Sequence, residues 1–104
     1  MTVNRDALNA LIAHYSEQKA LTDWGWNRCI IGVLGNQGVN VGASPYLLAQ
    51  YLGITVKEAE DMVYFMAEEW RTFDKLQPEE RPKLVVDALV RLRDTGKFSW
   101  RAQA

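Results

Sequence analysis

The sequence predicts an all-α fold, a single domain over residues 1–104 that packs about five helices. Apolar residues recur at three- and four-residue spacing along most of the chain, as one buried helix face requires. Capping residues and glycines stand where these stripes begin and end. The alternation typical of strands is confined to a short glycine-rich piece around residues 39–41. The pattern therefore favours a small helical bundle.

The first two helices are expected over residues 4–20 and 24–35. Asn4 suits the N-cap of the first, whose apolar face would be formed by Leu8, Leu11, Ile12 and Tyr15. The second is ambiguous because its β-branched residues and Gly32 also suit a strand. A small hairpin within residues 28–42 is therefore the alternative to that helix.

The middle of the chain contains two helices separated by a glycine, predicted over residues 45–52 and 56–70. Ser44 suits the N-cap of the first, and Gly53 suits a left-handed residue at its end. Thr55 and Glu58 have the spacing of a capping box for the next helix. The apolar stripe of that second helix is expected to contain Val56, Ala59, Met62, Val63, Met66 and Trp70.

The last helix is predicted over residues 82–95, after a turn that contains two prolines, and Gly96 ends it. Its apolar face would be formed by Leu84, Val85, Ala88, Leu89 and Leu92. We expect the first, fourth and last helices to supply most of the core.

Residues 44–70 resemble the helix-turn-helix motif, with Ala49, Gly53 and Ile54 at the positions that this pattern favours. The resemblance implies a DNA-binding transcriptional regulator. Its expected DNA contacts would be Thr55, Lys57, Tyr64 and Arg91.

Charge argues against DNA as the ligand of this segment. Affinity for DNA comes largely from Lys and Arg that meet phosphates. Acidic residues outnumber basic ones over residues 51–80, and two of them, Glu60 and Asp61, would face outward on the reading helix. Basic residues are in excess only over residues 81–104. DNA binding is therefore the alternative function and not the leading one.

Catalytic and metal chemistry have little support. The chain has one histidine, His14, and one cysteine, Cys29, so it has no internal disulfide and no cysteine-rich metal site. A small enzyme that uses a Cys29–His14 dyad is the second alternative. No cofactor is expected. The longest apolar run is too short to span a membrane, and we expect a cytoplasmic protein.

The leading hypothesis is a non-enzymatic protein-interaction module, a small regulator or inhibitor that acts by binding another protein. Tryptophans and an acidic helix face are the expected contacts, namely Trp24, Trp26, Glu60, Asp61, Glu68 and Trp100. A homodimer is a further expectation, because the acidic helix of one copy can meet the basic helix of another.

The chain is also similar to small uncharacterised phage and bacterial helical proteins. The matching residues are the Trp24–Trp26 pair around a glycine, the Cys29–Gly32 helix segment and the Leu52–Gly53 corner. This resemblance implies no particular activity.

Overall fold

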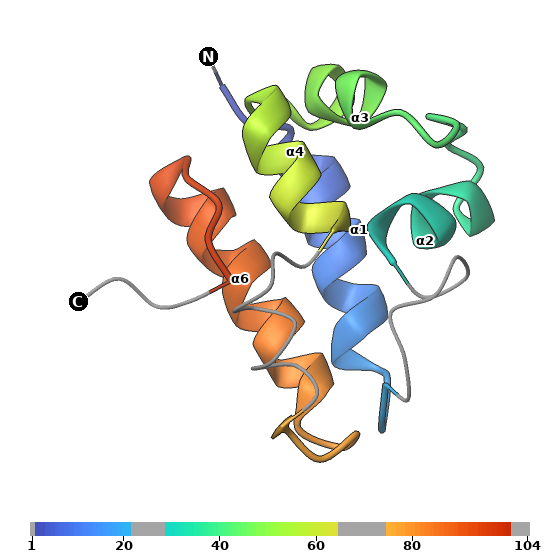
Figure 1. The fold of residues 1–104 in the computed structure, drawn as a ribbon, viewed down its shortest axis with the longest axis vertical. Coiled ribbons are helices and arrows are strands. Elements are labelled where there is room, and N and C mark those ends of the chain that lie inside the picture. The colour runs from blue at the N-terminus through green and yellow to red at the C-terminus, as the bar shows by residue number, and fades with distance from the viewer. Residues whose placement is uncertain (1, 22–28, 65–74, 101–104) are drawn as a thin grey trace.

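A computed structural model describes residues 2–21, 29–64 and 75–100 as helices joined by turns, with no strand in those ranges. The described ranges contain five helices, and Figure 1 shows how they pack against one another. Their bounds are α1 (Arg5–Ser16), α2 (Ile30–Asn36), α3 (Pro45–Leu52), α4 (Val56–Val63) and α6 (Arg81–Thr95). The predicted all-α bundle is confirmed, and α2 takes the place of the hairpin alternative.

The start of α1 is fixed by Asn4, as predicted. Its side-chain Oδ1 accepts a hydrogen bond from Ala7 N at 3.1 Å, which caps the helix. The same residue also binds the end of α3, because its backbone N donates to Leu52 O at 2.8 Å and its Nδ2 donates to Tyr51 O at 3.1 Å. One residue therefore caps α1 and holds it against α3.

The sequence predicted a first helix that extends to residue 20, but α1 ends at Ser16. The chain leaves the helix to reach the turn before α6, where Leu21 N donates to Pro78 O at 2.8 Å. The guanidinium of Arg81, which is buried, donates from Nη1 to Leu21 O at 2.9 Å. These long-range hydrogen bonds draw the backbone out of helical geometry.

α2 begins after Cys29 and ends at Asn36, where Val39 N folds back to Leu34 O at 2.8 Å. The first residues predicted for this helix, 24–28, lie outside the described ranges.

α3 and the turn to α4 match the prediction. Ser44 Oγ accepts from Leu47 N at 3.3 Å, and Gly53 adopts a left-handed conformation with φ 74°. A Cβ at Gly53 would collide with the backbone oxygen of Thr2, so only glycine lets the N-terminal backbone pass this close. Thr55 and Glu58 form the predicted capping box. α4 ends at Val63 and does not run unbroken to residue 70 as predicted, because the backbone of Tyr64 is extended (φ −109°, ψ 117°). Residues 65–70 lie outside the described ranges.

The core is centred on α1 and α6, which lie side by side (Figure 1) and make the most extensive contact between any two helices. Leu8 and Leu11 of α1 and Leu89 and Leu92 of α6 are fully buried. The core is broader than the sequence predicted, because α2 and α3 also contribute fully buried side chains. These are Ile30, Val33, Leu48 and Leu52.

Candidate interaction surface

The two helices of the α3–α4 corner expose apolar side chains. Among the described residues, every large hydrophobic side chain that is exposed belongs to these helices or to Tyr64, which follows α4: Tyr46 (61%), Leu47 (48%), Val56 (38%) and Tyr64 (54%). The opposite sides of both helices are buried through Leu48, Ala49, Leu52, Ala59 and Met62. We call the exposed set Tyr46, Leu47, Val56, Glu60 and Tyr64 the corner surface.

Helical spacing explains which residues of α4 face solvent. Val56 and Glu60 are four residues apart, so they share one side of α4, and Tyr64, the first residue after the helix, is exposed as well. Ala59 and Met62 define the buried side. The prediction that Val56 belongs to the buried stripe is wrong, because it lies about 120° around the helix from Met62.

The corner surface carries an acidic charge. Glu60 is exposed, and Asp61 lies beside it with its side chain 29% exposed. Lys57, whose side chain is 83% exposed, approaches Asp61 with an Nζ–Oδ2 distance of 3.7 Å. This is an exposed i, i+4 pair of small energetic weight, and Glu60 has no ion pair with any of the described residues.

One edge of α4 is covered by the segment that follows α6. Phe98 N donates to Glu58 Oε2 at 2.7 Å, and Trp100 Nε1 donates to Asp61 O. The two aromatic rings stack edge to face with centroids 5.0 Å apart, and both are buried. We call residues 97–100 the C-terminal strap.

Glu58 joins the strap to the α4 capping box. Its Oε1 accepts from both Thr55 N and Thr55 Oγ1 at 3.0 Å. Partial burial by itself would raise the pKa of Glu58. The hydrogen bonds from Phe98 and Thr55, together with the charge of Lys97, outweigh this effect and lower the pKa below its usual value.

The residues predicted as interaction contacts have different positions in the structure. Glu60 is on the corner surface, and Asp61 is at its edge. Trp100 is only 5% exposed, because its indole packs on Phe98 and donates to α4. It therefore serves the core and is not an exposed anchor. Trp24, Trp26 and Glu68 lie outside the described residues.

Sequence reasoning missed Tyr46 and Leu47 as surface residues. They lie off the Leu48–Ala49–Leu52 stripe of α3, and this offset was the available signal.

The predicted DNA contacts do not form one basic surface. Thr55 is occupied as an N-cap, and Lys57 pairs with Asp61. Tyr64 is exposed on the corner surface. Arg91 belongs to α6, where its Nη2 donates to Ser99 O at 2.7 Å and so holds the strap.

The residues of the second alternative, Cys29 and His14, are in different surroundings. Cys29 is 5% exposed in the core. His14 lies edge-on to Tyr15, with ring centroids 5.2 Å apart. Burial raises the pKa of Tyr15 well above its usual value, and the nearby Cys29 adds to the rise. The Cys29 thiol is thus not presented to a substrate in solution.

The described ranges contain no cluster of three His, Cys, Asp or Glu residues that could hold a metal ion. Within the same ranges, none of the helices combines the length and the apolar character needed to cross a membrane.

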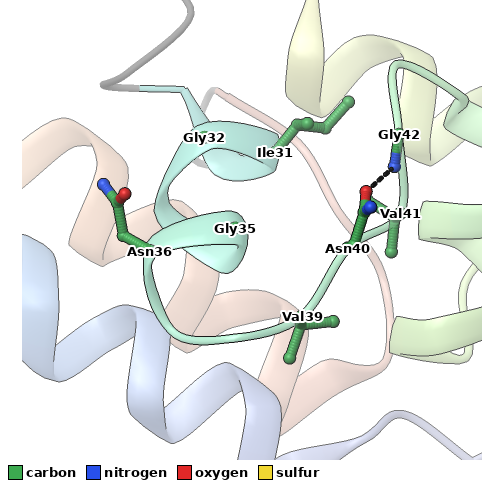
Figure 2. Close-up of a pocket in the computed structure, with 8 residues that line it drawn as sticks. All are labelled: Ile31, Gly32, Gly35, Asn36, Val39, Asn40, Val41 and Gly42. Atoms are coloured by element: carbon green, nitrogen blue, oxygen red, sulfur yellow. Dashed lines mark hydrogen bonds between the residues drawn. The ribbon is translucent and has the colours of Figure 1, made fainter.

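A cavity of about 240 Å³ lies between α2 and the loop that follows it (Figure 2). It is lined by Ile31, Gly32, Gly35, Asn36, Val39, Asn40, Val41 and Gly42. Gly42 N donates to Asn40 Oδ1 at 2.9 Å, which fixes the loop. No lining residue is charged, so this cavity offers no acid or base for catalysis.

Comparison with known proteins gives no identification of the chain. No protein-family model, curated protein or solved structure matches it.

Proposed function

We propose that this protein is a non-enzymatic interaction module that binds another protein through the corner surface. The observation that carries the proposal is that the exposed large hydrophobic side chains of the described residues are all on α3, α4 and Tyr64, the residue after α4. Scattered exposed apolar residues are normal on a protein surface, but a concentration on two adjoining helices is typical of a contact site.

The kinds of residue on the corner surface also suit a protein partner. Tyr46 and Tyr64 supply large, stiff rings with a polar hydroxyl, and tyrosine is enriched among residues that dominate binding energy. Leu47 and Val56 add aliphatic area. A partner that covers these side chains would gain about 25 cal/mol for each Å² of apolar area removed from water.

Charge indicates the chemistry of the partner. Glu60 and Asp61 adjoin the apolar groups, so a partner with Lys or Arg around an apolar patch is favoured.

A second copy of the chain fits less well, because two cations of α6 are already paired with carboxylates of the same helix. Lys83 pairs with Asp87 at 2.7 Å, and Arg93 pairs with Asp94 at 2.9 Å. The acidic-to-basic homodimer expected from the sequence is therefore the weaker proposal.

DNA binding is the second candidate, and one observation favours it. Ala49 and Ile54 are buried and Gly53 is left-handed, at the positions where a helix-turn-helix motif needs such residues. Against it, the outer side of α4 presents Glu60 and Asp61 to a ligand made of phosphates.

The test has two stages. Affinity capture with the wild type and matched variants first isolates a partner protein, which is then identified and purified. The Kd of each variant for that purified partner is measured next. The double variant Tyr46→Ser/Tyr64→Ser removes both exposed rings. Lys83→Ser, an exposed change on α6, is the control. We expect the wild type and the control to bind the same protein with equal Kd, and the double variant to bind it at least about tenfold more weakly.

Equal binding by the double variant would refute the proposal. Fluorescence anisotropy with duplex DNA, performed in parallel, tests the second candidate. DNA binding that weakens steeply with salt, and that strengthens in Glu60→Gln, would replace the protein partner with DNA.

A further inference from the structure

Arg91 carries a partly buried positive charge for which the described residues provide no carboxylate. Its Nη2 donates to a backbone oxygen, Ser99 O, at 2.7 Å. Its Nε is buried and makes no hydrogen bond within the described chain, so this atom is closed to a ligand from solvent. A buried charged group is usually paired with an opposite charge, and an unsatisfied buried donor costs free energy. The donors left open to an anion are on Nη1, which makes no hydrogen bond to a described residue, and on the second hydrogen of Nη2.

A pocket lies beside this guanidinium, at the end of α6. Its volume is about 240 Å³, and it is lined by Arg91, Thr95, Lys97 and Ser99. Two of these side chains are cationic and the other two carry hydroxyl groups. Gly96, with φ 79°, turns the backbone so that Lys97 and Ser99 return beside α6.

The carbonyl groups at the end of α6 oppose an anion less than a bare helix end would. Of the last four carbonyls of the helix, Leu92 O accepts from Gly96 N at 2.8 Å and Arg93 O accepts from Arg5 Nη1 at 3.2 Å. These acceptors point their lone pairs at donors within the chain and contribute less negative potential to the pocket.

We propose that this pocket binds a phosphate group. A guanidinium and an ammonium that approach from different chain segments suit an anion with several acceptor oxygens, more than a planar carboxylate that one guanidinium can hold alone. A water molecule occupies about 30 Å³ in the liquid, so the pocket has room for a phosphate. The site is separate from the corner surface and does not depend on the proposed function.

The two cations contribute unequally. Lys97 is exposed and already interacts with Glu58. Arg91 is partly buried and lacks an acidic partner in the described chain, so its charge is screened less by water. Removal of Arg91 should weaken binding more than removal of Lys97.

The experiment is an amide chemical-shift titration of the full chain with inorganic phosphate, with chloride at matched ionic strength as the blank. The variants are Arg91→Gln and Lys97→Gln, and Lys83→Gln on the outer side of α6 is the control. We expect saturable shifts at residues 95–99 in the wild type and the control. Kd should rise about tenfold or more in Arg91→Gln, as for one lost hydrogen bond to a charged group, and by a smaller factor in Lys97→Gln.

Because Lys97 is exposed, Lys97→Gln keeps the test decisive even if Arg91→Gln fails to fold. The proposal is overturned if the wild type shows no saturable shift, or if Kd is unchanged in Lys97→Gln and in a folded Arg91→Gln. A parallel titration with acetate tests whether the pocket prefers a carboxylate. Tighter binding of acetate than of phosphate would overturn the assignment to phosphate.

Discussion

Replacement of Glu58 by alanine should destabilise the protein by more than the loss of a helix cap. The Glu58 carboxylate accepts hydrogen bonds from Thr55 N, Thr55 Oγ1 and Phe98 N. Loss of the capping box costs about 1 kcal/mol. A hydrogen bond to a charged group contributes about 1.5–3 kcal/mol, which we reduce to about 1 kcal/mol because this carboxylate is partly exposed. The expected loss for Glu58→Ala is therefore about 2 kcal/mol.

The matched control is Thr55→Ala, which removes the hydroxyl of the cap but leaves the Glu58–Phe98 bond in place. We expect this variant to lose about 1 kcal/mol. Urea unfolding followed by far-UV circular dichroism measures both losses, and each kcal/mol corresponds to about 4–8 °C in Tm for a domain near this size. If Glu58→Ala loses no more than Thr55→Ala, the strap does not depend on the Glu58 carboxylate and the reasoning fails.

Three further predictions concern pH, backbone geometry and the corner surface. Because the folded pKa of Glu58 is lowered, its contribution to stability should be full above the ordinary glutamate pKa and should disappear as pH falls through the lowered value. The difference in unfolding free energy between wild type and Glu58→Gln should accordingly shrink between neutral pH and about pH 3, and a constant difference would contradict the assignment. Gly53→Ala should cost more than Gly96→Ala in thermal unfolding: both glycines have positive φ, but only at Gly53 would the new Cβ meet backbone. We expect about 1 kcal/mol for Gly96→Ala and at least about 2 kcal/mol for Gly53→Ala, and equal losses would show that the close approach does not matter. Tyr46→Ser/Tyr64→Ser should change the free energy of unfolding by less than about 1 kcal/mol, and a larger loss in urea unfolding would mean that the rings are structural.

The features that the sequence predicted well depend on neighbours within a few residues. Ser44, Gly53 and Thr55 each act on the backbone within their own turn, so their residue types are sufficient to indicate their roles. The bounds of α3 and the existence of the capping box follow from these three positions.

The features that were predicted wrongly depend on contacts between distant residues. α1 stops early because Leu21 binds Pro78, and no local pattern encodes that hydrogen bond. Trp100 is buried because α4 offers it the Asp61 carbonyl, which lies 39 positions earlier in the chain. The acidic part of the candidate surface could be predicted from charge, whereas its apolar part required knowledge of which side of α3 faces the core.

The pairing of α1 with α6 places the two ends of the described chain in one core, with α2, α3 and α4 between them in sequence. A ribosome must therefore release α6 before α1 can pack against it and complete the core. Until then, the part of α1 that packs against α6 stays open to water or to a chaperone. Closing such a long loop is slow compared with forming a local helix pair, so this bundle should fold after synthesis and more slowly than helical proteins of its size whose neighbours in sequence pack together.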